Sequence, residues 1–315
     1  MTDARATIGA TMVDPPLVPL LLHWYRAHAR PLPWRHGVTP WGVLVSEFML
    51  QQTPVPRVVP VFQAWLARWP DATALAADPP GEAVRMWGRL GYPRRALRLH
   101  AAAVECVDSH AGAVPETLDD LRALPGVGDY TAAAVAAFAF GQRAVVLDAN
   151  VRRVHARLLG GHERAPDGSP GVGERLRAER LLPEDATRAA ELSVAVMELG
   201  ALVCTARAPS CTRCPVADHC VWLRDGRPAW AGPTPRRQKY AGTDRQCRGS
   251  LLDVLRNAPG EVGRSALDAA WGDDVQRERA LRSLLVDGLV EEVRSPSAGG
   301  DPTPAYRLPS RRGRQ

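Results

Sequence analysis

The sequence predicts a mostly α-helical protein that ends in a small domain of helices and strands. Apolar residues recur at helical spacing through most of residues 17–199, with Pro and Gly between the segments. No convincing strand pattern precedes residue 280, whereas two short strand-like segments follow it. With 315 residues, 45% of them apolar, the chain can bury a sizeable core and fits two or three domains.

Nine helices are predicted before residue 200. The first begins at Leu17 and ends before Pro31, because proline disfavours helical backbone in the residue that precedes it. The second is apolar on nearly every face and is therefore expected to be buried. The expected helices span residues 17–29, 41–52, 55–69, 82–87, 94–110, 118–124, 129–140, 150–159 and 187–199.

A linker and a second small domain are predicted next. Proline and glycine interrupt residues 225–243, which we interpret as the linker. Three short helices and two strands then suggest a winged helix-turn-helix at 244–309. These elements are expected at 245–257, 264–271, 275–287, 289–293 and 305–308. Residues 1–16 are expected to be a flexible N-terminus, and 310–315 a basic tail.

The composition narrows the classes of function. The net charge of +6 weakly favours an anionic partner such as nucleic acid, although a GC-rich genome would also enrich arginine. Lys239 is the only lysine, so a Schiff-base mechanism would need Lys239 or the N-terminal amine. No apolar run approaches the roughly 20 residues of a membrane span, and the N-terminus lacks a secretory pattern. We therefore expect a cytoplasmic protein without a membrane partner.

Four of the six cysteines are clustered, at positions 204, 211, 214 and 220. This spacing and the predicted reducing compartment indicate a metal site rather than disulfides. Four thiolates in one short loop suit a 4Fe–4S cluster with Cys204, Cys211, Cys214 and Cys220 as its ligands. Zinc is the competing metal, but zinc ribbons carry two close cysteine pairs and this loop has one. The exposed arginines Arg207 and Arg213 are expected to face a polyanion.

Two carboxylates stand in different predicted surroundings. Glu47 is the one charge on the apolar helix at 41–52, so burial should raise its pKa and make it a general acid. Asp148 precedes the helix at 150–159, whose N-terminus should hold it ionised. Each has a plainer interpretation, namely a structural Glu–Arg pair for Glu47 and an ordinary helix cap for Asp148. Together, such a pair suits cleavage of a glycosidic bond.

A glycine turn joins the helices at 118–124 and 129–140. Residues 124–130 are Leu-Pro-Gly-Val-Gly-Asp-Tyr. The backbone N–H groups around Gly126 and Gly128 could bind a phosphate without reading sequence. By itself this turn is weak support, since many helical hairpins look alike.

Taken together, these motifs resemble the helix-hairpin-helix DNA glycosylase superfamily, and most closely adenine DNA glycosylases of the MutY type with an actinobacterial character. The resemblance covers residues 30–222 and implies that fold, with an iron–sulfur subdomain (17–36 and 147–224) and a six-helix subdomain (37–146). Its matching stretches are Leu32-Pro-Trp-Arg35, Val45-Ser-Glu-Phe-Met-Leu-Gln-Gln-Thr53, Leu90-Gly-Tyr92, Leu124-Pro-Gly-Val-Gly-Asp-Tyr130, Leu147-Asp-Ala-Asn-Val151, Met197-Glu-Leu-Gly200 and the cysteine loop.

The resemblance also implies roles for individual residues. Glu47 would protonate the adenine leaving group and then help to activate water, and Asp148 would stabilise the sugar cation. Tyr130 and Asn150 would orient these groups. The remaining implied sites are a base pocket of Leu32, Trp34, Arg35 and Val194; a duplex contact of Gln52, Thr53 and Tyr92, with Gln52 and Tyr92 as a wedge; and an alkali ion on the carbonyls of Arg122, Leu124 and Val127.

Tyr130 and three departures from the family pattern refine this hypothesis. Bifunctional relatives carry a catalytic lysine where this chain has Tyr130, which implies a monofunctional glycosylase. Val194 stands where the family usually has Gln or Glu to read the adenine edge. The usual Asp-Gly-Asn is Asp148-Ala-Asn150, as in mismatch-specific thymine glycosylases. The C-terminal region does not resemble the Nudix-like domain that inspects 8-oxoguanine, so a winged helix would contact DNA there or form a passive cap.

The leading hypothesis is a bacterial, nucleoid-associated base excision repair enzyme that removes adenine mispaired with 8-oxoguanine or guanine. We expect it to act as a monomer on duplex DNA containing a mismatch or an oxidised base. The alternatives are a glycosylase for thymine, uracil or another purine lesion, a non-enzymatic iron–sulfur DNA-binding regulator and, as the weakest, a lyase.

Overall fold

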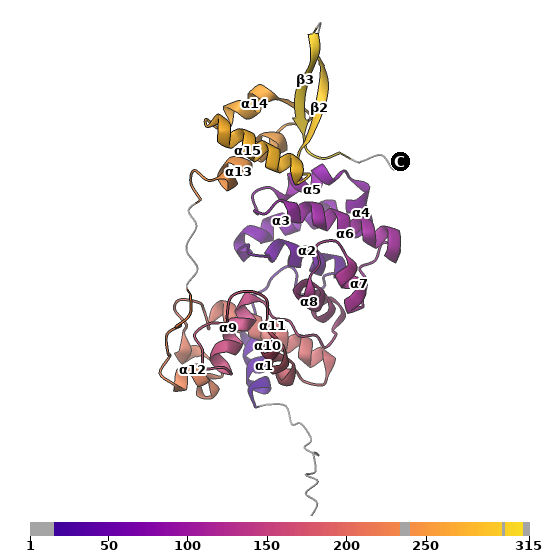
Figure 1. Cartoon of the computed structure of the whole chain (residues 1–315). Helices are drawn as coiled ribbons and strands as arrows, with labels where there is room; N and C mark the ends of the chain where they lie inside the picture. Colours follow the sequence, from indigo (N-terminus) through magenta and orange to yellow (C-terminus); the bar gives the residue numbers. More distant parts are fainter. Residues whose placement is uncertain (1–15, 234–239, 298–299, 311–315) are drawn as a thin grey trace, which may run out of the picture. The chain divides into compact units, whose positions relative to one another are not determined.

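The computed structural model describes residues 16–233, 240–297 and 300–310 (Figure 1). Its described residues form two compact units. The first is built from residues before 32 together with 136–233, and the second from 32–135 together with the C-terminal residues from 234. The mostly helical class with a small C-terminal sheet is confirmed. Lys239 lies outside the described residues, as do all but the last residue of the N-terminal segment 1–16 and all but the first of the predicted tail 310–315.

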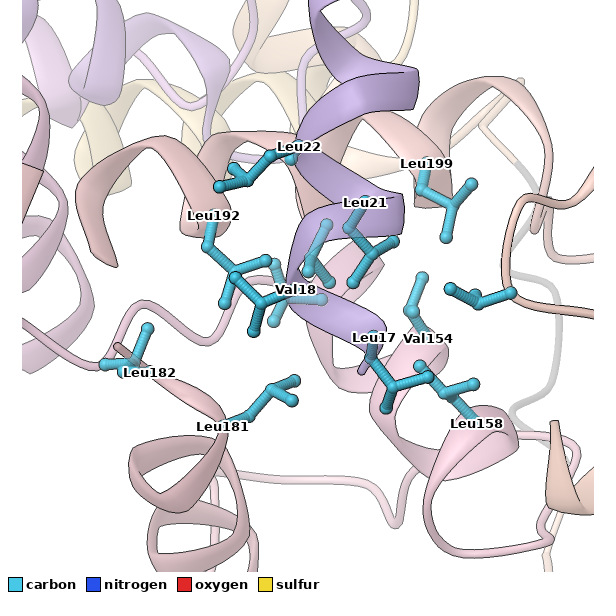
Figure 2. Close-up of a cluster of buried hydrophobic side chains, with 14 of the residues drawn as sticks. Leu17, Val18, Leu21, Leu22, Val154, Leu158, Leu181, Leu182, Leu192 and Leu199 are labelled. Carbon is cyan, nitrogen blue, oxygen red and sulfur yellow. The ribbon is translucent and has the colours of Figure 1, made fainter. Parts of the chain in front are cut away.

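The first unit packs helices around one apolar core (Figure 2). Helix α1 (Leu17–His28) contributes Leu17, Val18, Leu21 and Leu22 to this core, on the spacing of an amphipathic helix. Its partners are α9 (Ala149–Leu158), α10 (Val172–Leu181) and α11 (Ala186–Leu202). The 3₁₀ turns Cys211–Arg213 and Ala217–His219 and the short α12 (Val221–Arg224) follow. These pieces shape the cysteine loop.

The second unit begins with seven helices between residues 37 and 146, one more than expected. They are α2 (Pro40–Leu50), α3 (Val55–Arg68), α4 (Ala72–Ala77), α5 (Pro80–Trp87), α6 (Arg94–His110), α7 (Leu118–Ala123) and α8 (Asp129–Phe140), which runs on past residue 135. The unpredicted α4 has six residues, too few to display a helical period. Trp65, Trp69 and Trp87 pack edge to face in the core of this unit.

The C-terminal domain contains α13 (Asp244–Asn257), α14 (Arg264–Ala269) and α15 (Asp274–Val286). Its antiparallel sheet has three strands in the order β1-β3-β2 rather than the two predicted. Strand β1 (Val262–Gly263) lies before residue 280 and was not predicted, because two residues cannot show an alternating pattern. Strands β2 (Glu291–Ser297) and β3 (Gly300–Arg307) are longer than expected.

This C-terminal domain is joined to α5 by backbone and side-chain contacts within the second unit. The Arg85 guanidinium donates to the carbonyl oxygens of Arg256 and Ala258. The Gly81 N–H donates to the Pro309 carbonyl at 2.7 Å, where a Cβ at position 81 would lie only 2.6 Å from that oxygen. Glycine at 81 therefore permits the two backbones to approach.

Candidate active site and iron–sulfur loop

Glu47 lies on α2, a helix with buried side chains on every face. Thr39 caps the helix by accepting a hydrogen bond from the Gly42 N–H at 3.3 Å, and Pro40 occupies the first helical position, which suits proline. The Glu47 residue is only 6% exposed among apolar neighbours such as Leu44 and Phe48. The predicted burial of this carboxyl is confirmed. Its catalytic role stays a prediction.

Asp148 caps α9, as the sequence predicts. One carboxylate oxygen accepts a 2.6 Å hydrogen bond from the Val151 N–H, and the other accepts one from the Asn150 amide at 2.9 Å. Burial is the strongest influence on Asp148 and raises its pKa, while these hydrogen bonds and Arg153 act to lower the pKa. The prediction that Asp148 is held ionised considered only the helix N-terminus. Burial opposes that effect, so the site favours the anion less than predicted.

Arg153 connects this cap to the cysteine loop and was not predicted. Its guanidinium donates to Asn150 Oδ1 at 2.8 Å, to the Gly200 carbonyl at 2.7 Å and to the Cys204 carbonyl at 2.8 Å. Gly200 permits the approach of α11, because a Cβ there would lie 2.8 Å from the Asn150 Cβ. Asn150 is thus held between Asp148 and a fixed arginine.

The four clustered cysteines share one loop, and their thiols influence one another. Burial, with smaller contributions from Cys204, Cys220 and Cys211, raises the pKa of the Cys214 thiol to about 11. Four such thiolates require a cationic group between them. No three His, Cys, Asp or Glu side chains in the described parts of the chain form a site for a single metal ion. Arg207 and Arg213 are exposed on this loop, and their contact with a polyanion stays a prediction.

Arg157 is the buried cation beside this loop, at 2% exposure. Its guanidinium donates to the carbonyls of Glu163 (2.7 Å), Thr205 (2.7 Å) and Ala206 (3.1 Å), and to Cys204 Sγ at 3.4 Å. It also stacks on Trp222, 4.6 Å from the ring centroid. This N–H donor and the coupled thiols fit a negatively charged thiolate cluster.

The glycine turn between α7 and α8 packs against α2 and α6. Gly126 has a φ of +85°, and a Cβ there would lie 3.1 Å from Phe48 Cε1 and 2.7 Å from Arg98 Cβ. Gly128 is exposed with open space beside it, as a backbone phosphate contact requires. The Leu124 carbonyl, one of the three expected alkali-ion ligands, accepts the Val127 N–H at 3.1 Å. The ion itself stays a prediction.

The expected duplex contacts have different surroundings. Gln52 and Tyr92 adopt positive φ angles of 54° and 49°, and Tyr92 is half exposed. Both border a pocket of about 240 Å³ that Arg94, Arg95 and Arg98 also line. Thr53, in contrast, is buried and accepts a hydrogen bond from Arg95 at 3.1 Å, so it supports this loop. Its contact with DNA stays a prediction.

The remaining candidates divide between the two units. Trp34 packs edge to face on Phe62 with ring centroids 5.4 Å apart, and the Arg35 N–H closes a turn on the Leu32 carbonyl at 3.1 Å. Together with Tyr130 at the start of α8 and Glu47, these residues belong to the second unit. The first unit holds Asp148, Asn150 and the partly buried Val194 of α11.

Comparison with known proteins identifies the family of the chain. Residues 45–170 match the HhH-GPD superfamily of base excision DNA repair proteins, and residues 204–220 match the iron–sulfur binding domain of endonuclease III. The adenine DNA glycosylase of Mycolicibacterium smegmatis is 54% identical over 276 residues, which cover 87% of this chain and 92% of that protein. The chain belongs to the adenine DNA glycosylase family.

A second relative agrees with this family membership, and a solved structure agrees with the fold. The adenine DNA glycosylase of Mycobacterium tuberculosis is 53% identical over 86% of this chain and 88% of its own length. A solved thermostable thymine-DNA glycosylase aligns with a TM-score of 0.60 and 28% identity, over 66% of this chain and 95% of that one. The predicted helix-hairpin-helix glycosylase fold is confirmed. The match at 204–220 also selects the 4Fe–4S cluster over zinc.

The N-cap geometry makes a stability prediction for this adenine DNA glycosylase. We expect Asp148→Asn to raise the free energy of unfolding at neutral pH, because asparagine also caps helices and removes a desolvated charge. Because the pKa of Asp148 is raised in the folded protein, the cost of burying its charge applies in full at pH values above that pKa. The advantage of the variant should therefore shrink as pH falls through that pKa.

Denaturant unfolding of both proteins at several pH values measures this difference. We expect excision of the base to be lost in the same variant. The assigned cost of burying the Asp148 charge would be contradicted if the variant were less stable than the wild type at neutral pH and its relative stability rose on acidification.

Proposed function

We propose that the protein is a monofunctional glycosylase that hydrolyses the N-glycosidic bond of adenine mispaired with 8-oxoguanine or guanine. The observation that carries this proposal is the pair of carboxyls in distinct local settings. Glu47 is a buried residue of α2, whereas both carboxylate oxygens of Asp148 accept hydrogen bonds at the start of α9. Membership of the adenine DNA glycosylase family supports adenine as the excised base.

The mechanism follows from these two settings. Glu47, as an acid with little contact with water, donates its proton to the departing adenine and then accepts one from the attacking water. Asp148 stabilises the positive charge that develops on the sugar. Asn150 keeps the Asp148 carboxylate oriented, since Arg153 fixes the amide from its other side. We assign contacts with the excised base to Tyr130, Trp34, Arg35 and Leu32 of the second unit and to Val194 of the first.

The DNA contacts are proposed from exposure and turn geometry. Gly126 and Gly128 bind a backbone phosphate, while Gln52 and Tyr92 enter the duplex as the base is extruded. The carbonyls of Arg122, Leu124 and Val127 hold an alkali ion at this hairpin. The 4Fe–4S cluster, when bound, supplies iron–thiolate bonds that hold residues 204–220, from which Arg207 and Arg213 reach the phosphates.

The setting of the protein is part of this proposal. We place it in the bacterial cytoplasm, where it acts on the nucleoid as a monomer. Among the described residues, no helix combines the length and apolarity that a bilayer span demands. Family membership as an enzyme of base excision repair sets aside the non-enzymatic regulator.

A second candidate is a mismatch-specific thymine or uracil glycosylase. The similarity to a thymine-DNA glycosylase structure favours it, as does the Asp148-Ala-Asn150 sequence. Val194 offers no hydrogen bond to an adenine edge. The identity of the released base separates these two candidates directly.

The decisive experiment uses duplexes that contain A:8-oxoguanine, A:G, T:G, U:G or hypoxanthine pairs, each assayed with and without alkali. Adenine release from the first two alone supports the proposal, and thymine or uracil release supports the second candidate. We expect strand breaks only after alkali, because Tyr130 has no amine to attack the sugar. Breaks before alkali would restore a lyase. Lack of any release would refute glycosylase activity.

A further inference from the structure

Arg95 is a buried cation at the start of α6 that the proposed chemistry does not use. It is 7% exposed, and its guanidinium donates to the carbonyls of Phe48 (2.9 Å), Gln51 (2.6 Å) and Gly91 (3.0 Å), and to the Thr53 hydroxyl (3.1 Å). One side chain therefore ties the end of α2 to the loop before α6. Without it, the last carbonyls of α2 would lose their partners.

Two of the carbonyls that Arg95 binds belong to residues that come directly before a residue with unusual backbone. Gln52 follows the Gln51 carbonyl directly, and Tyr92 follows the Gly91 carbonyl directly. Both Gln52 and Tyr92 have positive φ, which costs a non-glycine residue about 1–3 kcal/mol. Holding those two carbonyls fixes the peptide planes that lead into Gln52 and Tyr92, and so restricts the directions in which these two residues project.

One donor of the buried Arg95 is left without a partner in the described part of the chain. Burial lowers its pKa to about 10, so it stays protonated at neutral pH. It lies over the rings of Trp87 and Tyr92, 5.3 Å from each centroid. Its buried Nε–H has no hydrogen-bond partner within the described residues. A buried cation with an unsatisfied donor, beside two strained residues, is typical of a functional constraint rather than of optimised stability.

We infer that Arg95 is a positioning residue that holds Gln52 and Tyr92 in the conformation that enters the duplex. This inference rests on the proposed function, which assigns duplex opening to these two side chains. Arg95 itself is buried and touches no DNA. Its removal should therefore impair extrusion of a paired base while leaving the chemistry on an already unpaired base largely intact.

Arg95→Lys tests this inference, because one ammonium keeps the charge but cannot serve both sides of the loop. We expect single-turnover adenine release from the A:8-oxoguanine duplex to fall about tenfold or more, and release from a duplex without the opposite base to fall less than about threefold. Hydrogen exchange should rise at residues 50–53 and 91–92. Thr53→Val removes one acceptor of Arg95 and should show the same split more weakly.

Arg143→Met is the matched control, since Arg143 also donates to three carbonyls, those of Pro183, Glu179 and Leu182, in the other unit. It should change the two rates alike or leave both unchanged. Equal loss on both substrates in Arg95→Lys, or no loss on either, would overturn the inference. If adenine release by Arg95→Lys fell only as much as its loss of unfolding free energy explains, that result would also count against the inference.

A fluorescent adenine analogue in the duplex separates this inference from the proposed function. Its emission rises on unstacking, so it reports duplex opening without cleavage. If the wild type opens the duplex but releases no adenine, the proposed function fails while the fluorescence still tests Arg95→Lys. If the wild type does not open the duplex, the positioning role is overturned as well.

Discussion

Glu47→Gln is expected to stop adenine release while the protein still binds its mispaired duplex. Glutamine has nearly the same shape and should occupy the same place on α2, but it cannot donate a proton to the leaving base. General acid–base groups contribute about 10²–10⁴-fold to rate, so single-turnover release should fall at least about 10²-fold. Duplex affinity, measured by fluorescence anisotropy, should change less than about threefold.

Glu198→Gln provides a control with the opposite expectation. Glu198 is fully buried and accepts hydrogen bonds from Arg30 at 3.0, 2.8 and 2.7 Å. It is therefore a structural glutamate paired with an arginine, the role that was the plainer interpretation of Glu47. Its replacement should lower the free energy of unfolding yet leave release per folded molecule close to normal. Equal loss of binding and release in Glu47→Gln would contradict the assigned acid.

Arg157→Met is expected to cost both the iron–sulfur cluster and much of the stability of the first unit. The variant keeps apolar volume against Trp222 but removes the guanidinium that donates to the carbonyls of Glu163, Thr205 and Ala206. Hydrogen bonds to a charged group contribute about 1.5–3 kcal/mol each, so loss of these three should lower the free energy of unfolding by about 3 kcal/mol or more. Iron content per chain and visible absorbance should fall as the cysteine loop loses its support.

Arg152→Met is the comparison on the same helix. Arg152 donates to the carbonyls of Pro166 and Gly168 and pairs with Glu174 at 2.9 Å, away from the cysteines. It should lose stability but retain full iron. If Arg157→Met purified with normal iron and an unchanged unfolding free energy, the support assigned to Arg157 would be wrong.

Local sequence patterns predicted those parts of the site that depend on residue type and near neighbours. An apolar helix with one glutamate is buried wherever it packs, and Glu47 is buried. An aspartate before a helix becomes its N-cap, and Asp148 accepts the Val151 N–H. The cysteine spacing required only a short loop. The hydrogen bond from Arg95 to Thr53 was not predicted, because nothing in the sequence around Thr53 indicates it.

By itself the sequence determined which residues supply acids, thiolates and helix caps, since these follow from side-chain chemistry and short spacing. Only the tertiary structure decided which of the many arginines are structural. Arg95 reaches a carbonyl 47 residues away along the chain, and Arg157 reaches one 48 residues away. Backbone carbonyls are present at every position, so no sequence motif marks those that a distant guanidinium binds. The physical reason is that burial and hydrogen bonding of a long cation depend on segments that meet only in the folded chain.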